Sequence, residues 1–116
     1  MIATALILGA TLLVGATLLA KYWNRVVDVL KKAIQKLQSI VAGTLVGSAV
    51  FISKLGARYQ NRTKHYSKTN LGKWEETIVS YEQTAEEIPE EYRNSAENVK
   101  EYDLTMELEL QLRNSR

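Results

Sequence analysis

The residues best suited to general acid–base chemistry are carboxylates that come in adjacent pairs. The three pairs are Glu75/Glu76, Glu86/Glu87 and Glu90/Glu91. Glycoside hydrolases do use two carboxylates at one site. Adjacent acids in a strongly acidic segment are, however, more typical of a solvated surface, where they interact mainly with water. We therefore expect no catalytic pair among them.

Other catalytic and metal-binding chemistry lacks the residues it needs. The chain has no cysteine and one histidine, His65, so thiolate ligands and a multi-histidine metal site are excluded. The sequence contains no P-loop, dinucleotide-binding, zinc-protease or serine-hydrolase motif. A nucleophile and its base would have to come from serine, lysine or carboxylates alone. The sequence predicts a protein that is not an enzyme and that holds no cofactor or metal.

Basic and aromatic side chains gather in a polar segment in the middle of the chain. The basic patch comprises Lys54, Arg58, Arg62, Lys64, Lys68 and Lys73, with Tyr59, His65 and Tyr66 between them. Cations contact phosphates and aromatic rings stack on bases, which makes nucleic acid the least favoured of three candidate partners. Anionic lipid headgroups are the second. We favour the third interpretation, in which residues 56–73 form a connector that meets the acidic tail of the same or a neighbouring chain.

Charge is segregated along the 116 residues into three blocks. Residues 1–20 carry no charged side chain, residues 21–73 carry eleven Lys/Arg against one acid, and residues 74–116 carry twelve Asp/Glu against four Lys/Arg. The net charge of +2 conceals this pattern. The opposite signs predict basic-to-acidic contacts, including contacts between copies of the chain.

The elements that must position these charges begin with an apolar segment from Ile2 to Ala20. It contains no charge and no proline, and as a helix it would be about 28 Å long, close to the hydrocarbon thickness of a bilayer. Neither a basic n-region nor a small-x-small cleavage site marks it as a cleaved signal peptide. We predict a transmembrane helix over residues 1–21. Its expected self-association face contains Gly9, Thr11 and Gly15.

A heptad-like pattern follows over residues 22–55. The positions at 3-4 spacing are Val27, Leu30, Ile34, Leu37, Val41, Thr44, Ser48, Phe51 and Leu55. This pattern predicts a long helix, either in a coiled coil or bundle or lying singly on the membrane. Gly43 and Gly47 form a GxxxG motif, which with Thr44 and Ser48 extends the self-association face. The residues expected at the membrane interface are Lys21, Tyr22, Trp23 and Arg25.

Residues 39–53 are apolar on all sides, as either a second, short crossing or a buried core helix would be. The positive-inside rule favours a single crossing, because a second one would place Lys54 and Arg58 outside. We therefore predict a protein of the inner (cytoplasmic) membrane. Its N-terminus would lie outside and its body in the cytoplasm.

The acidic block, residues 74–116, has the pattern of a small β-hairpin cap. Residues 74–83 are rich in Thr, Ile, Val and Tyr, which favours a strand. Pro89, with acids around it, predicts the first turn of a short helix. Residues 102–112 alternate apolar and polar side chains, which predicts a half-buried strand. The residues expected to pack on the apolar face of the cap are Trp74, Ile78, Leu104, Met106, Leu108 and Leu110.

Together these features predict a mainly α fold with a small β element. The expected segments are a transmembrane helix at 1–21, an amphipathic helix at 22–55, a basic connector at 56–73 and the acidic cap at 74–116. The leading hypothesis is a homo-oligomeric membrane assembly, such as a bacterial or phage pore or membrane-permeabilising effector. The alternatives are a non-conducting membrane-anchored scaffold that presents the cap to a protein partner, and a membrane-tethered binder of nucleic acid or anionic lipid. The expected partners are membrane lipid, copies of the chain and, as a further candidate, another protein.

Overall fold

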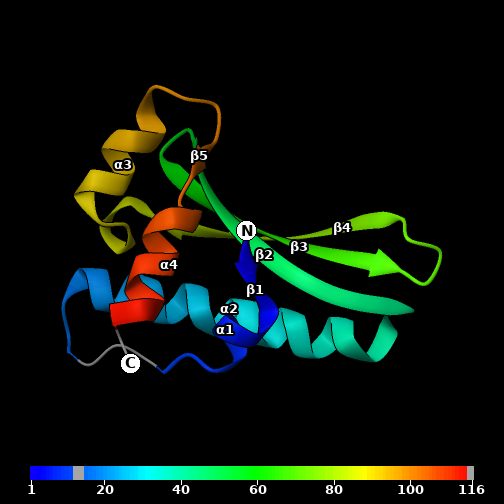
Figure 1. The fold of residues 1–116 in the computed structure, drawn as a ribbon. Coiled ribbons are helices and arrows are strands. Elements are labelled where there is room, and N and C mark those ends of the chain that lie inside the picture. The colour runs from blue at the N-terminus through cyan, green and yellow to red at the C-terminus, as the bar shows by residue number, and fades with distance from the viewer. Residues whose placement is uncertain (12–14, 115–116) are drawn as a thin grey trace.

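The computed structural model describes residues 1–11 and 15–114 as an α+β fold built around one antiparallel sheet (Figure 1). In chain order the elements are β1 (Ile2–Ala3), α1 (Thr4–Leu8), α2 (Leu18–Ile40), β2 (Gly43–Leu55), β3 (Arg58–Thr69), β4 (Trp74–Thr84), the 3₁₀ helix η1 (Ala85–Glu87), α3 (Glu90–Glu97), β5 (Tyr102–Asp103) and α4 (Thr105–Asn114). The predicted mainly α fold is wrong, because the middle of the chain forms the strands of the sheet.

Three long strands, β2, β3 and β4, lie side by side in that order. Tight turns join them, and Gly56 and Gly72 in these turns adopt φ values of 59° and 80°, which glycine reaches without steric cost. β1 pairs with β2 at Ser48, and β5 pairs with β2 at Phe51, so both short strands lie on the same edge of β2. β4 forms the opposite edge of the sheet.

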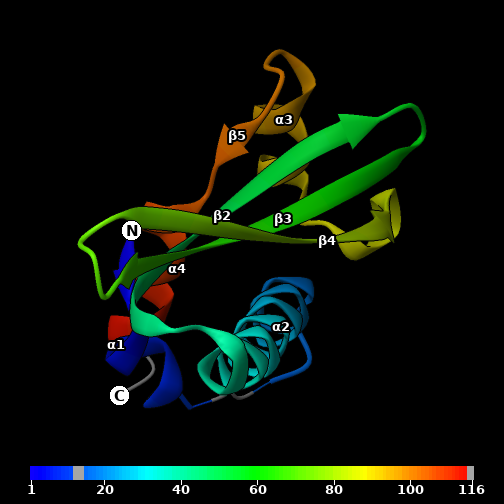
Figure 2. The same cartoon turned by 90° about the vertical axis from the view of Figure 1, so that its right-hand side faces the viewer.

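The long helix α2 lies across one face of the sheet, which we call the inner face, and the opposite face is the outer face (Figure 2). Residues paired across antiparallel strands point to the same face. Ile52, Asn61 and Tyr81 are paired in this way and form one row of the inner face. α3 and α4 both contact β2 and complete the core.

A chain of buried hydrogen bonds connects α2 to the sheet and to α3. The Tyr22 hydroxyl donates to Asn61 Oδ1 at 2.6 Å, and Asn61 Nδ2 donates to Gln83 Oε1 at 2.8 Å. Trp23 Nε1 donates to the Tyr92 hydroxyl at 3.0 Å. Burial raises the pKa of Tyr22 far above its usual range, so its hydroxyl keeps the proton that it donates. These bonds set where α2 sits on the sheet.

The residues predicted at a membrane interface therefore lie in two environments. Tyr22 and Trp23 are 2% and 1% exposed and belong to the core. Lys21 and Arg25 lie on the exposed side of α2, and the Arg25 guanidinium stacks over the Tyr81 ring at 5.2 Å. An aromatic pair next to basic residues suits a membrane interface, but here it anchors a helix to a sheet.

The apolar N-terminal segment does not form one helix. It is divided into β1, α1 and the first turn of α2. Gly9 ends α1, Gly15 has a φ of 118°, and the Thr17 hydroxyl caps α2 by accepting a hydrogen bond from Ala20 N at 3.1 Å. Small residues that suggested helix packing in lipid thus act as helix ends and turns. Within residues 1–11 and 15–114, no helix combines the length and apolarity needed to span a membrane.

The predicted transmembrane helix over residues 1–21 is accordingly wrong, and so is the pore or other membrane assembly that was built on it. The membrane-anchored scaffold and the membrane-tethered binder depended on the same transmembrane helix, so these two hypotheses are wrong as well. Thr11 lies between the elements, and residues 12–14 of the segment lie outside the described residues. Membrane lipid as a partner, and the location at the cytoplasmic membrane, stay predictions.

The heptad-like pattern is helical only in its first half. Val27, Leu30, Ile34 and Leu37 form the buried stripe of α2, but the helix ends at Ile40 and residues 43–55 form β2. The coiled coil is therefore wrong, and β-branched and aromatic residues explain the change of structure. Gly43 and Gly47 do allow a close approach, but between strands. A Cβ at Gly47 would lie 2.5 Å from Ile2 O, and one at Gly43 would clash with the backbone at Lys68.

The predicted basic connector is mostly a strand. Residues 58–69 form β3, the central strand, which pairs with β2 and β4 along its length. Its buried side chains are largely polar, and they include Asn61, Thr63, His65 and Ser67. An alternation of apolar and polar residues, the usual sign of a strand, is absent for this reason.

The acidic cap contains one confirmed strand and one wrong strand. β4 covers the predicted strand at 74–83, and α3 follows Pro89 as expected. Residues 102–112, predicted as a strand, form β5 and then α4. Leu104, Leu108 and Leu112 are buried at helical spacing, whereas Met106 and Leu110 are exposed. The alternating pattern contained this i, i+4, i+8 stripe, and leucine, methionine and glutamate favour a helix.

Replacement of Tyr22 by phenylalanine tests the buried network. The ring stays but Asn61 Oδ1, which is buried, loses its donor, so the free energy of unfolding should fall by about 1–3 kcal/mol in urea denaturation. Tyr66→Phe is the matched control, since Tyr66 lies half-buried on the outer face and its loss should be clearly smaller. Equal losses in the two variants would contradict the network.

Candidate functional site

The outer face of the sheet gathers basic side chains because β3 alternates them. Its even-numbered positions point outward, and they are Arg58, Gln60, Arg62, Lys64, Tyr66 and Lys68. This is most of the predicted basic patch. The other two members lie elsewhere: Lys54 is paired with Tyr59 and reaches Glu97 of α3 at 3.9 Å, and Lys73 is exposed in the β3–β4 turn.

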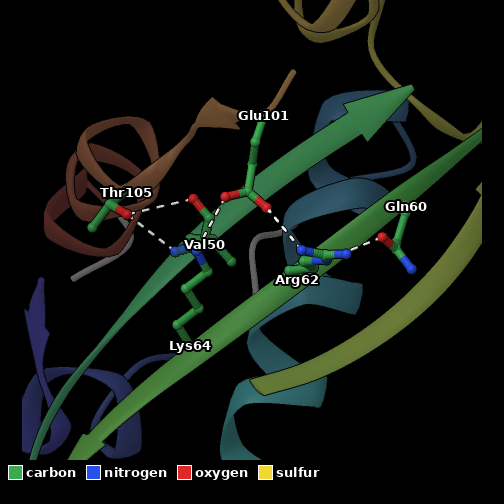
Figure 3. A network of polar contacts seen from close by, with 6 residues as sticks. All are labelled: Val50, Gln60, Arg62, Lys64, Glu101 and Thr105. Carbon is green, nitrogen blue, oxygen red and sulfur yellow. Dashed lines mark hydrogen bonds and ion pairs between the residues drawn. The ribbon is translucent and has the colours of Figure 1, made fainter. Parts of the chain in front are cut away.

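A carboxylate from outside the basic segment lies between the two central cations (Figure 3). Glu101 accepts a hydrogen bond from Lys64 Nζ at 3.1 Å and lies 3.6 Å from an Arg62 guanidinium nitrogen. Arg62 Nε also donates to Gln60 Oε1 at 3.0 Å. Three strand residues and one loop residue thus form a single polar network.

The position of Glu101 is set by the short strand that follows it. β5 pairs with β2 at Phe51, and just after it Thr105 makes two backbone contacts to Val50: its hydroxyl accepts from Val50 N at 3.0 Å and lies 3.4 Å from Val50 O (Figure 3). The Asp103 carboxylate accepts from Thr105 N at 2.8 Å, which closes the turn into α4. Glu101 is therefore held at the edge of the outer face rather than on a free tail.

Aromatic rings lie between the cations. Lys64 Nζ lies 4.1 Å from the centre of the Phe51 ring, and Lys68 Nζ lies 5.8 Å from that of Trp74. Burial, and after it a hydrogen bond to Glu76, raises the pKa of Tyr66. An open groove of about 450 Å³ runs between these rings, and its lining consists of Met1, Ala49, Phe51, Tyr66, Trp74 and Asp103.

The charges on the outer face balance. Arg58 lies 3.4 Å from Glu82 of β4, and Glu101 serves both central cations. The acidic members of the face are Glu76, Glu82, Glu101 and Asp103, and the basic members are Arg58, Arg62, Lys64 and Lys68. The Arg58–Glu82 pair is about half exposed and contributes little to stability, whereas Lys64 and Glu101 are more buried, with side chains 18% and 23% exposed.

The residues predicted to pack on the cap are divided by the structure. Trp74 and Ile78 lie on the outer face of β4 and are 57% and 47% exposed, so they join the candidate surface. Leu104 and Leu108 are buried against the core, and Met106 and Leu110 lie on the exposed side of α4. Of the predicted self-association residues, Ser48 and Gly47 are buried in β2, Gly43 is half-buried there, and Thr44 is exposed. Gly9, Thr11 and Gly15 lie in the N-terminal segment before α2, outside β2.

Sequence reasoning missed the partners that complete the surface. Phe51, Glu101 and Met1 come from three separate parts of the chain, so no local pattern joins them. One signal was present, because every lysine and arginine of β3 stands at an even position, with period two. That period predicts a strand whose cations share one face.

The structure also brings together a serine and the lone histidine. Ser48 Oγ lies 2.8 Å from His65 Nδ1, and Thr63 Oγ1 lies 2.9 Å from His65 Nε2. A nucleophile–base pair has this geometry. Ser48 and His65 are, however, 2% and 1% exposed, so no substrate reaches them, and the contacts satisfy polar groups inside the core. In the described part of the chain, no cluster of three or more candidate ligands could hold a metal ion.

The buried histidine makes stability depend on pH. Burial lowers the pKa of His65 below its usual 6.5, so the unfolded chain takes up a proton that the folded chain resists. Stability should be fully present above pH 6.5 and should fall as the pH drops below it, by up to about 1.4 kcal/mol between pH 7.5 and 5.5.

Urea denaturation at the two pH values measures this change, and His65→Gln is the control because it removes the only histidine. If the variant lost as much stability as the parent between pH 7.5 and 5.5, the histidine would not be the cause.

Comparisons with known proteins assign no family to the chain. No protein-family model, curated protein or solved structure matches it.

Proposed function

We propose that the protein is a binding module that recognises another protein through the outer face of its sheet. The observation that carries this proposal is the composition of that face, because aromatic rings and a methionine line its groove and two arginines of β3 point to the same side of the sheet. Protein interfaces are enriched in these residue types. The residues that dominate binding energy in such interfaces are mostly Trp, Tyr and Arg.

The charge balance of the face favours a protein over nucleic acid. Nucleic acid binds when uncompensated Lys and Arg side chains neutralise its phosphates and release the counterions that were bound there. Arg62 and Lys64 are already paired with Glu101, and Arg58 is paired with Glu82. A face with both signs of charge and exposed rings is complementary to a mixed protein surface, where opposite charges set orientation and rings supply buried area.

The groove supports one further detail of the proposal. Trp74 is the most exposed ring lining it, and Lys68 and Asp103 lie at the same surface with opposite charges. An apolar side chain of the partner would enter the groove, with polar groups around it. This is the usual arrangement of an apolar centre and a polar rim.

A photo-crosslinking residue, p-benzoylphenylalanine, placed at position 74 tests the proposal in the native cell. We expect a discrete adduct from position 74 to a protein other than a second copy of this chain, and no adduct of the same mass from position 40. Ile40 is the control because it is 69% exposed and stands at the end of α2. Adducts of equal pattern from the two positions, or none at position 74, would contradict a binding site on the outer face.

The captured partner then allows a quantitative test. Trp74→Ala should weaken its affinity at least about tenfold, since removal of a central aromatic that dominates an interface costs about 2 kcal/mol or more, and about 1.4 kcal/mol is already a factor of ten. Ile40→Ala should leave the affinity unchanged. A single-stranded oligonucleotide serves as the competing probe. Binding of that oligonucleotide at physiological salt, much tighter than the non-specific range of 10⁻⁴ to 10⁻⁶ M, would favour nucleic acid instead.

A further inference from the structure

The free edge of β4 differs from the other edge of the sheet. The edge of β2 that does not pair with β3 is occupied by β1 and β5, two short strands from distant parts of the chain. Along β4, no strand within residues 1–11 and 15–114 pairs with the far edge. The fold covers one edge with two separate segments and leaves its opposite edge open (Figure 2).

The sequence of β4 lacks most of the devices that protect an edge strand, although it does carry three charged residues, Glu75, Glu76 and Glu82. Natural edges are blunted by charged side chains, above all lysine, and by proline, a bulge or short length. β4 is 11 residues long, contains no lysine, arginine or proline, and pairs with β3 in an unbroken register from Trp74 to Thr84. Its unpaired N–H and C=O groups form a regular template for another strand.

We propose that the strand that occupies this edge is β4 of a second copy, paired antiparallel across a two-fold axis at Ile78. This goes beyond the proposed function, because the outer face can bind its partner whether or not the edge is paired. The symmetry restricts the register. Facing residues must point to the same side of the joined sheet, so each residue faces one whose number differs from its own by an even amount, and the axis passes through a single position.

Side-chain chemistry then selects Ile78 as that position. With the axis at Ile78, the isoleucines face each other, Glu76 faces Ser80, and Trp74 faces Glu82. With the axis at Val79, Glu76 would face Glu82, and like charges directly opposite are destabilising. With the axis at position 77 or 80, Ile78 would face Glu76 or Glu82. Among the registers centred on positions 77 to 80, which pair most of β4, only the one centred on Ile78 keeps its apolar side chain from facing a charge and avoids facing glutamates.

The proposed pairing enlarges the candidate binding surface. Both outer faces would lie on the same side of one continuous sheet, with Trp74 of each copy next to Glu82 of the other. Trp74 and Ile78, whose exposure is otherwise high for large apolar side chains, would lie at the centre of the joined face. A partner would then meet two copies of the surface at once.

A single cysteine reports the register directly, because the chain has none of its own. In an antiparallel pair, facing Cα atoms lie about 4.5–5.5 Å apart, a distance that a disulfide spans. Ile78→Cys should therefore form a covalent dimer under mild oxidation. Ser80→Cys is the matched control on the same face of β4: its two copies would be offset by four residues, about 14 Å along the strands, and should crosslink at least tenfold more slowly.

Light scattering on the full chain measures the assembly without a crosslink. The parent protein should have twice the mass of one chain at high micromolar concentration. Ile78→Lys places two like charges opposite each other and should give the mass of one chain, whereas Ser80→Lys places lysine opposite Glu76 and should keep the dimer. Ile78 and Ser80 are both exposed in one copy, so circular dichroism should show both variants folded.

Three outcomes would overturn the proposal: a parent protein that stays monomeric, faster crosslinking at position 80 than at 78, or a dimer that survives Ile78→Lys with unchanged affinity. None of these affects the proposed function, which depends on the crosslink from position 74 to another protein. Loss of that adduct in a protein that still dimerises would overturn the proposed function alone.

Discussion

The structure depends on the need to satisfy the polar residues on the inner face of β3. A buried polar group without a hydrogen bond costs about 1–3 kcal/mol. Asn61 finds its partners in Tyr22 of α2 and Gln83 of β4, and His65 finds its partners in Ser48 and Thr63. Each of these hydrogen bonds forms only when the helix and strands that carry its donor and acceptor are correctly aligned. The position of α2 and the register of β2 and β4 on β3 are therefore consistent with one another, in a way that apolar packing alone would not require.

The same constraint explains why the central strand was not predicted. A strand is recognised when apolar and polar side chains alternate, but in β3 both faces are polar. What alternates is the kind of polar residue, cations at even positions and mostly neutral hydrogen-bonding groups at odd ones. β4 was predicted because Thr, Ile, Val and Tyr favour strands whatever their partners. The first half of α2 was predicted from its apolar stripe, because that stripe is buried against apolar neighbours.

Two of the wrongly predicted elements, the helix at residues 1–21 and the strand at residues 102–112, had sequence patterns that fit more than one structure. Hydropathy counts the length of an apolar run, but Gly9, Gly15 and Thr17 end or begin helices inside that run. In residues 102–112, the apolar residues at every second position include every fourth, so the strand and the helix predict the same buried Leu104 and Leu108. Tertiary contacts decide between them. The outer-face surface could be predicted only in part, because its cations are local while Glu101 and Phe51 reach it through pairing of distant strands.

The segregation of charge along the sequence now has a structural explanation. The basic strand β3 lies next to the acidic strand β4, and residues 97–103 approach it from beyond β2. Its cations form ion pairs with both segments: Arg58 with Glu82, and Arg62 and Lys64 with Glu101. The blocks of opposite sign thus meet within one chain. Since these cations are largely compensated, the net field of the outer face is weak and steers a partner little over distance. Under the proposed function, recognition comes from short-range contacts: those of the exposed rings on the face and, at its edge, those of the β4 backbone, which pairs with no described strand other than β3.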